Sequence, residues 1–299
     1  MARVLVTGAS GFVGAVVQKR LRELGHEVIG TTTGIPSGGE QYCNIEDRDG
    51  VKATLHDVQP EILIHCAAIS SVTAGRTLDY YRVNTAGTEN LIGAFADLPA
   101  RQRFVFVSTA GVYGNQDVEV LHENLCPKPV HHYGLSKFCC ERIVQNYMDE
   151  VEWTIIRPFN IIGEGQNAEF IVPKLVRAFE ARLPVIKLGN LDVYRDYVDI
   201  HDAAEILINL AFNPAAAGET VNLCSGKPVS LKDLISTLET ITGHQIEVEV
   251  AAEFVRQNEV WRLLGDARKL ERLMGGALKF KPFQETLRRM LAVDQGIAR

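Results

Sequence analysis

The sequence lacks any excess of positive charge and any long apolar run. Its 31 Lys and Arg stand against 37 Asp and Glu, which gives a net charge of −6 and a pI near 5.8. Nucleic acids and anionic membrane surfaces require basic patches, so both partners are disfavoured. No uncharged apolar run approaches the roughly 20 residues that cross a bilayer. The apolar strand pattern begins almost at once, so we expect no signal peptide and a cytoplasmic location.

Cysteine is also sparse. The six cysteines form no Cys-x-x-Cys pair and no Cys/His spacing of a zinc site, so we expect reduced thiols, no disulfide scaffold and no metal. The adjacent Cys139 and Cys140 are interpreted as helix filler, because free cysteine is often buried. Hydrophobic residues make up 46% of the 299 residues and charged residues 23%, which is ordinary for a soluble globular protein. This length suits one large domain or two unequal ones.

The first half of the chain alternates strand and helix patterns. Its near-continuous Val and Ile runs are typical of strands covered on both faces. The pattern predicts an α/β fold, a Rossmann-type doubly wound parallel sheet. Strands are predicted at 3–7, 26–31, 62–66, 104–107 and 151–156, and helices at 11–24, 51–58, 77–97 and 133–149.

After about residue 160 the pattern loosens and prolines interrupt it. We predict a dinucleotide-binding domain over 1–160. Residues 161–299 then form a smaller, interleaved C-terminal α/β lobe that is mainly substrate-binding, with some segments returning to the first domain. A small molecule is expected to bind in a cleft between the two. The expected elements of the second half are helices at 170–181, 202–212 and 231–242 and strands at 220–223 and 245–250.

A glycine-rich turn follows the first predicted strand and opens the first helix. Gly8 permits a tight turn, Gly11 lets the backbone approach a pyrophosphate, and Gly14 lets the helix pack close to the strand. The free N–H groups of the helix then face the phosphates. The position of the turn between strand and helix favours dinucleotide binding over a merely structural turn.

The end of the second predicted strand bears on cofactor choice. The segment from Val28 to Thr33 has no carboxylate to hold the ribose 2′-hydroxyl of NAD, and no arginine to bind the 2′-phosphate of NADP. The hydroxyls of Thr31, Thr32 and Thr33 can bond to either group. We predict that NADP(H) is preferred and NAD(H) is tolerated. Asn44 and Ile45 lie where the next strand could contact adenine.

Tyr133 and Lys137 are four residues apart on a predicted helix, so both side chains lie on one face. The positive charge of the lysine would favour the phenolate and lower the pKa of the tyrosine. Tyr133 could then give a proton to a carbonyl oxygen or remove one from an alcohol. This spacing also occurs by chance on surface helices, and it gains weight from the dinucleotide motif upstream.

Together these motifs resemble the extended short-chain dehydrogenase/reductase family, the NAD-dependent epimerase/dehydratase family. The matching segments, in order, are the glycine-rich start, His65-Cys66-Ala67-Ala68, 84–88, 108–114, the Tyr133/Lys137 pair and Arg157-Pro158-Phe159-Asn160. The resemblance implies that Thr109, Tyr133 and Lys137 are catalytic: Thr109 bonds to the sugar oxygen, Tyr133 is the acid/base, and Lys137 also holds the nicotinamide ribose. The cofactor-binding residues that it implies are Gly8, Ser10, Gly11, Phe12, Val13, Gly14, Thr32, Asn44, Ile45, Cys66, Ala67, Ala68, Asn84, Tyr133 and Lys137.

Motifs in the C-terminal half are similar to those of GDP-4-keto-6-deoxy-D-mannose reductases, which reduce a C4 ketone to give GDP-D-rhamnose. They lie at 158–166, 170–174, 189–199 and 222–226. Arg195 suits a diphosphate because guanidinium donates two parallel bonds; an ion pair with Asp192 or Asp196 is the alternative. The substrate contacts implied by the resemblance are Thr109, Ala110, Asn160, Val172, Lys174, Arg195, Arg256 and Glu259.

Other activities stay open. The 4,6-dehydratases carry Thr-Asp-Glu where this chain has Thr109-Ala110-Gly111, so efficient dehydration is not expected. The alternatives are a nucleotide-sugar 4-epimerase with tightly bound NAD, a dTDP- or UDP-4-keto sugar reductase, and a non-catalytic binding protein on the same fold. Epimerases usually keep an acidic residue after the second strand, which is missing here.

Two further features stand out. The segment His131-His132-Tyr133-Gly134 replaces the Asn-Pro-Tyr-Ala that is more usual in the family. The predicted helices at 77–97 and 133–149 look partly apolar on a second face. In the family such helices pair across a two-fold axis, so we expect a homodimer.

Overall fold

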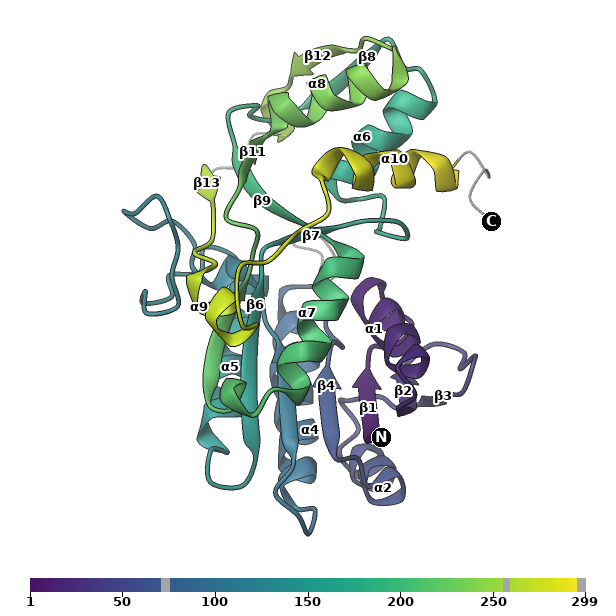
Figure 1. Ribbon diagram of the computed structural model, residues 1–299, viewed down its shortest axis with the longest axis vertical. Coiled ribbons are helices and arrows are strands. Elements are labelled where there is room, and N and C mark those ends of the chain that lie inside the picture. The colour runs from purple at the N-terminus through teal and green to yellow at the C-terminus, as the bar shows by residue number, and fades with distance from the viewer. Residues whose placement is uncertain (71–75, 255–258, 295–299) are drawn as a thin grey trace.

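The computed structural model describes residues 1–70, 76–254 and 259–294. A large parallel sheet with helices on both faces forms one part of the molecule, and a smaller α/β lobe lies beyond one end of its strands (Figure 1). Within the described residues the large sheet has seven strands, in the order β10-β6-β5-β4-β1-β2-β3. Their bounds are β1 Arg3–Thr7, β2 Glu27–Thr32, β3 Glu40–Tyr42, β4 Ile62–His65, β5 Arg103–Val107, β6 Glu152–Pro158 and β10 Glu219–Leu223.

The strand order confirms the predicted doubly wound fold. From β1 the chain moves outward through β2 and β3, and then returns to β4 on the other side of β1. The order therefore reverses between β1 and β4, and ligands of such sheets bind at this reversal, beyond the carboxyl ends of the strands. Every pairing in this sheet is parallel, so those ends all meet at one edge.

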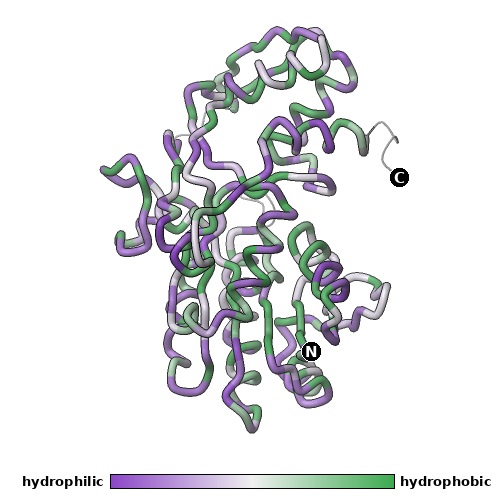
Figure 2. The backbone as a smooth tube through the Cα atoms, viewed as in Figure 1, coloured by the Kyte–Doolittle hydropathy of each residue, from purple (hydrophilic) through white to green (hydrophobic). Residues whose placement is uncertain are grey.

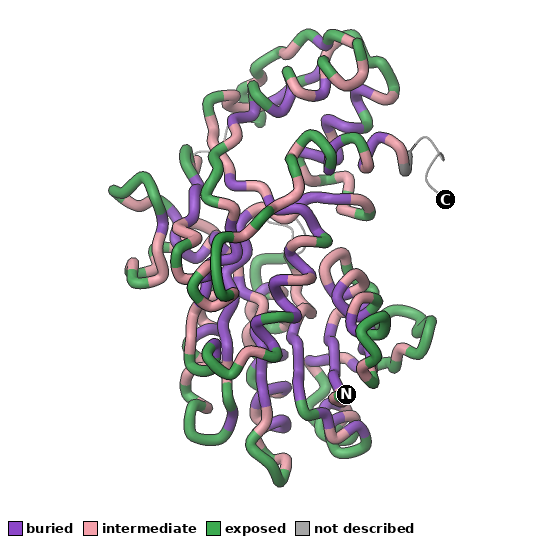
Figure 3. The backbone as a smooth tube through the Cα atoms, in the orientation of Figure 1, coloured by how far each residue is buried: buried purple, intermediate pink, exposed green. Residues whose placement is uncertain are grey.

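Each strand of the large sheet contributes to two cores. Val4 and Val6 of β1 pack with α1 and α7 on one face, whereas Leu5 packs with α2, α4 and α5 on the other. This alternation follows from the two-residue period of a strand, and explains why the strands read as continuous apolar runs. The same strands are hydrophobic in Figure 2 and buried in Figure 3. The helices of this part are α1 Phe12–Glu23, α2 Arg48–Val58, α4 Gly87–Ala96, α5 His132–Asn146 and α7 Ile200–Phe212.

The stretch predicted as one helix over 77–97 is divided. Helix α3 (Thr77–Asp79) leads into a π-helical turn, η1 (Tyr80–Ala86), which continues as α4. Asn84 lies in the π-helical part, and its side chain bonds to both the N–H and the carbonyl of Ile69. Widened turns of this kind are frequent at functional sites.

Two segments from the second half of the chain belong to the large sheet and its covering layer. Strand β10 pairs in parallel with β6, with Thr220 opposite Ile155. Helix α7 lies beside α1 (Figure 1) and contributes Leu207 and Leu210 to the same core as Val6. The two halves are therefore interleaved, while a boundary at residue 160 stays a prediction.

The smaller lobe contains strands that the sequence pattern did not indicate. Strand β9 pairs with β7, β11 and β13, and β8 pairs with β12. Strand β12 matches the strand predicted at 245–250. The others are short and partly exposed, so they carry no clear apolar alternation. No helix among the described residues is both long and apolar enough to cross a bilayer. The strands are β7 Asn160–Ile162, β8 Val185–Leu188, β9 Tyr194–Asp199, β11 Pro228–Ser230, β12 Glu247–Val250 and β13 Arg262–Leu263, and the helices are α6 Ile171–Glu180, α8 Leu231–Thr242, α9 Arg268–Leu273 and α10 Phe283–Asp294.

Because Leu207 is fully buried against the large sheet, we expect Leu207→Ala to lower the free energy of unfolding by about 2–5 kcal/mol. Urea denaturation followed by circular dichroism measures this. Leu183→Ala is the matched control, since Leu183 is exposed, and should leave the midpoint nearly unchanged. Equal effects of the two substitutions would contradict the packing of α7 on this sheet.

Candidate active site

The glycine turn brings the start of α1 against the end of β1. Gly8 has a φ of +66°, and a Cβ there would lie 2.8 Å from the backbone N of Ala67. A Cβ on Gly14 would collide with the Gly8 carbonyl oxygen. Gly11 precedes the helix and supplies no side-chain cap, so the first N–H groups of α1 stay available to an anion. The turn fits the pyrophosphate of a dinucleotide.

The threonines at the end of β2 were predicted to bond to the adenosine part of a cofactor, and most of them are buried or already hydrogen-bonded within the protein. Thr31 is buried, so its hydroxyl cannot reach a cofactor. Thr32 Oγ1 lies 2.7 Å from Ser10 Oγ and accepts a hydrogen bond from the backbone N of Gly34. Thr33 is exposed at the strand end. Thr33 is therefore the threonine of this segment whose side chain is exposed to a ligand. Thr32 instead contacts Ser10 and so supports the glycine turn.

Other predicted cofactor residues lie around the same edge of the sheet. Ala67 N donates to Thr7 Oγ1, and Thr7 is bonded to the buried His65 ring behind it. Burial raises the pKa of the neighbouring Cys66 thiol to about 12, so this thiol stays neutral. Asn44 Oδ1 accepts from the backbone of Glu46, and Ile45 is buried beneath Gly87. Phe12 and Val13 are half-buried in the first turn of α1.

The three predicted catalytic residues converge. Thr109 follows β5 and caps a short 3₁₀ turn, η2 (Ala110–Val112), by accepting from Gly111 N at 3.0 Å. Tyr133 lies in the first turn of α5, close enough to Thr109 for hydrogen bonding with that hydroxyl to favour a lower pKa of the phenol. Lys137, one turn further on, is 2% exposed, and its Nζ lies 4.1 Å from the centroid of the Phe106 ring.

The electrostatics of Tyr133 differ from the sequence expectation. Burial raises the pKa of Tyr133 to about 12, and only the bond with Thr109 opposes that rise substantially. The expected lowering by Lys137 is not found, because desolvation of the phenolate dominates. Burial lowers the pKa of Lys137 for the corresponding reason, since it penalises the ammonium. Tyr133 is thus a neutral phenol at neutral pH, and it carries the proton that a donor needs.

Asn84 joins the π-helical turn to α5. Its Nδ2 donates to Ser136 Oγ at 3.1 Å, while its Oδ1 accepts from Ile69 N at 2.8 Å. Ser136 Oγ in turn donates to the Tyr133 carbonyl. Asn84 therefore fixes the turn of α5 that carries Tyr133 without touching the phenol.

Sequence reasoning missed a buried ion pair, one partner of which lies on the same helix as two of the predicted catalytic residues. Arg157 donates to both carboxylate oxygens of Glu141, at 3.0 and 2.7 Å, and Ser108 donates to the same carboxylate. Burial pulls the pKa of Arg157 down, but the bonds and charge of Glu141 outweigh it and raise that pKa. The signal available in the sequence was the spacing, since Glu141 follows Lys137 by four residues on one helix face.

The structure brings together two predicted substrate residues that are 64 positions apart. Arg195 donates to Glu259 Oε1 at 3.3 Å and to the Val260 carbonyl at 2.7 Å. The alternative partners for Arg195 were wrong, because Asp192 pairs with Lys232 and Asp196 accepts from Ser225 and neighbouring backbone N–H groups.

The remaining predicted substrate residues are dispersed. Asn160 is half-buried at the start of β7, and Ala110 is buried beside Thr109. Val172 is 2% exposed in the core of the smaller lobe. Lys174 Nζ lies 4.5 Å from the centroid of the Phe254 ring. Arg256 lies outside the described residues.

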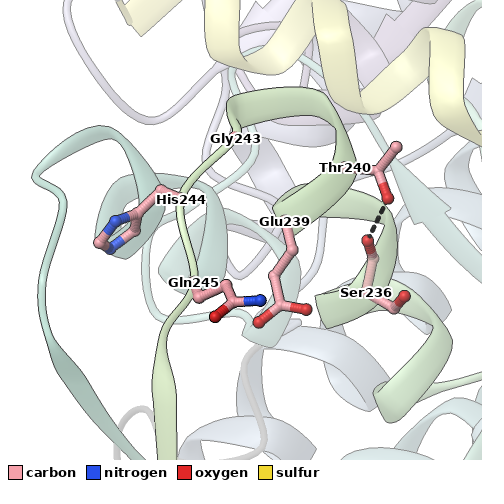
Figure 4. A pocket seen from close by; sticks show the side chains of 6 residues that line it. All are labelled: Ser236, Glu239, Thr240, Gly243, His244 and Gln245. Carbon is pink, nitrogen blue, oxygen red and sulfur yellow. Dashed lines mark hydrogen bonds between the residues drawn. The ribbon is translucent and has the colours of Figure 1, made fainter.

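A surface depression of about 570 Å³ lies on the smaller lobe, away from these residues (Figure 4). It is formed by the end of α8 and the loop that follows, so no polar groups from separate elements converge there. Across residues 1–70, 76–254 and 259–294 no group of three or more His, Cys, Asp or Glu side chains could hold a metal ion. The residues that line the depression are Ser236, Glu239, Thr240, Gly243, His244 and Gln245.

Comparison with known proteins shows the family to which the chain is similar. The model of the NAD dependent epimerase/dehydratase family matches residues 4–224. A GDP-6-deoxy-D-talose 4-dehydrogenase from Aggregatibacter actinomycetemcomitans is 37% identical over 290 residues, with 96% of each chain covered. A GDP-6-deoxy-D-mannose reductase from Pseudomonas aeruginosa is 29% identical, with 91% of each covered.

Solved structures extend the similarity to the whole fold. The crystal structure of a protein from Burkholderia cenocepacia matches with a TM-score of 0.91 at 35% identity, covering 100% of this chain and 99% of that one. The UDP-glucose 4-epimerase of Thermus thermophilus, solved in complex with NAD, matches with a TM-score of 0.87 at 26% identity, covering 98% and 99%.

Because Glu141 and Arg157 are both almost fully buried, removing one partner leaves an uncompensated charge in the core. We expect Glu141→Ala to lower the free energy of unfolding by about 3–5 kcal/mol, measured by urea denaturation. Lys232→Ala breaks a pair in which both side chains are exposed, and should leave the midpoint unchanged. A midpoint for Glu141→Ala within error of the unmodified protein would refute the structural role of the pair.

Proposed function

The chain belongs to the NAD dependent epimerase/dehydratase family, and from this premise we propose that it reduces the C4 ketone of a GDP-linked 4-keto-6-deoxyhexose with NAD(P)H. One observation carries the proposal: the side chains of Tyr133 and Thr109 come close together at the edge of the sheet where the glycine turn also lies. A proton donor beside a dinucleotide turn is the arrangement that carbonyl reduction requires.

The proposed mechanism assigns one role to each side chain. When bound, NAD(P)H supplies the hydride that reaches the carbonyl carbon. Tyr133 donates its hydroxyl proton to the carbonyl oxygen, so the ketone becomes a secondary alcohol. Thr109, whose side chain lies close to the phenol, is proposed to bond to the same carbonyl oxygen and orient it. Solvent then returns a proton to Tyr133, and Lys137 would hold the nicotinamide ribose of the bound cofactor.

The proposed substrate class rests on two relatives that are named for different GDP-linked sugars. The Aggregatibacter enzyme is a 4-dehydrogenase of GDP-6-deoxy-D-talose, and the Pseudomonas enzyme is a reductase named for GDP-6-deoxy-D-mannose. Talose and mannose differ in configuration at C4, so both sugars relate to one 4-keto compound, GDP-4-keto-6-deoxy-D-mannose. Arg195, paired with Glu259 in the smaller lobe, is proposed to meet the diphosphate.

The configuration of the product distinguishes two candidates. The sequence motifs predict GDP-D-rhamnose, the 6-deoxymannose product. The higher identity to the talose enzyme, 37% against 29%, favours GDP-6-deoxy-D-talose as a second candidate. The two products differ only in the face of the ketone that receives the hydride.

We further propose that NADP(H) is preferred and that the chain forms a homodimer. No carboxylate follows β2, where Thr33 is the exposed residue, so the 2′-phosphate of NADP meets no repulsion. Leu78 of α3, Leu135 of α5 and Met148 just after α5 are exposed apolar side chains on the two helical segments expected to pair.

The reduction is tested with GDP-4-keto-6-deoxy-D-mannose and NADPH. We expect equimolar loss of NADPH absorbance and formation of one C4 epimer, identified by the H3–H4 coupling in the NMR spectrum. Tyr133→Phe should lower kcat by about 10²–10⁴-fold. Tyr147→Phe, at the other end of α5 and bonded to Glu89, is the matched control. Interconversion of sugars without net NADPH consumption would instead establish the 4-epimerase alternative.

For the cofactor, we expect kcat/KM to be higher with NADPH than with NADH. Thr33→Asp should lower kcat/KM for NADPH about tenfold and leave that for NADH unchanged or higher, because a carboxylate repels the 2′-phosphate and bonds to the 2′-hydroxyl. Thr33→Ser controls for the substitution itself. A large preference of the unmodified protein for NADH would overturn the proposed NADP specificity.

A further inference from the structure

His131 lies immediately before α5 and caps it. Its backbone is extended, with φ −144° and ψ 158°, and its Nδ1 accepts a hydrogen bond from Gly134 N at 2.9 Å. An imidazole nitrogen can accept only when it carries no proton, so this cap requires the neutral ring with its proton on Nε2. The side chain therefore performs the capping task that asparagine performs in other helices.

The ring of His131 also fills a space between α5 and the turn that carries Thr109. It stacks on Tyr133, with ring centroids 6.1 Å apart and an interplanar angle of 16°. A Cβ on Gly111 would lie 3.3 Å from the His131 Cε1 atom. A Cβ on Gly134 would lie 3.0 Å from that atom and 2.7 Å from the Gly111 carbonyl oxygen. Glycine at 134 thus leaves room first for the Gly111 carbonyl oxygen and then for the imidazole, so the departures at 131 and 134 are compatible with each other.

We infer that His131 is a positioning residue, which sets the phenol of Tyr133 against Thr109 and does so only while its imidazole is neutral. The inference rests on the proposed function, since it concerns the same phenol. It acts through the helix cap and the ring stack, and requires no contact between His131 and substrate.

Protonation of the ring removes the cap. It puts an N–H group opposite Gly134 N–H and a positive charge at the positive end of the helix dipole, and both are unfavourable. The titratable groups of the described residues on the surrounding elements are the phenol of Tyr133, the Tyr80 phenol packed on it, the hydrogen-bonded Tyr81–His132 pair, and the Lys137 ammonium. Thr109 and Gly111 in the adjoining turn are uncharged.

The kinetic test compares three variants under the reductase assay. We expect His131→Ala to lower kcat about tenfold with KM unchanged, because the phenol loses its position. His131→Asn keeps a capping oxygen and should recover most of kcat at pH 8. The kcat of the unmodified protein should fall several-fold as the pH is lowered from 8 to below the ordinary histidine pKa, whereas His131→Asn should lose less than about twofold. His132→Asn, the neighbouring control, should keep the acid fall.

A second measurement uses the ligand-free protein and needs no substrate. Long-range ¹H–¹⁵N NMR should show the Nε2–H tautomer of His131, and the Gly134 amide signal should shift with the same midpoint as the ring. An Nδ1–H tautomer, or a Gly134 signal that ignores the ring, would overturn the inference. So would a His131→Asn protein whose kcat falls with acid as the unmodified protein does. Absence of turnover with any 4-keto sugar would count against the proposed function alone, and the NMR result would still decide the cap.

Discussion

Glu141 and Arg157 form the buried ion pair on which the geometry of the candidate site depends. The pair joins α5, which carries Tyr133 and Lys137, to the end of β6, and Ser108 ties the end of β5 to the same carboxylate. Ser108 is the residue before Thr109, and Glu141 lies on the helix that carries Tyr133. The Glu141 carboxylate therefore holds both backbone segments from which the Thr109 and Tyr133 hydroxyls project. Buried charges are costly unless every bond is made, and this cost restricts how α5 can pack.

The rest of the site is arranged around that fixed helix. Asn84 holds the first turn of α5 through Ser136, and His131 caps it. The glycine turn meets the same edge from β1, because parallel strands end together. Arg195 and Glu259 are bonded to each other in the smaller lobe, and the second half of the chain joins the sheet and its covering layer through β10 and α7. Interleaving of the two halves therefore connects the lobe that carries these predicted substrate residues to the sheet that carries the phenol.

The similarity to other proteins divides the functional question into a shared part and a variable part. The family match and the fold are shared with nucleotide-sugar dehydrogenases, reductases and epimerases, so they indicate NAD-dependent chemistry on nucleotide sugars. They do not distinguish one substrate or product from another, because one fold hosts many activities and the side chains of the site decide between them.

The sequence alone was sufficient for the Rossmann-type sheet, the glycine turn and the placement of Tyr133 and Lys137 one turn apart on a helix, because local periodicity and spacing carry these features. It was insufficient for the short strands β7, β9 and β11 and for the π-helical turn, which are stabilised by partners distant in the chain. Tertiary packing alone decided that Arg195 pairs with Glu259, that Glu141 and Arg157 meet, and that the pKa of Tyr133 is raised. The physical reason is the same in each case. Burial and long-range contacts set the energy of a polar group, and neither can be inferred from the residues adjacent to it in the sequence.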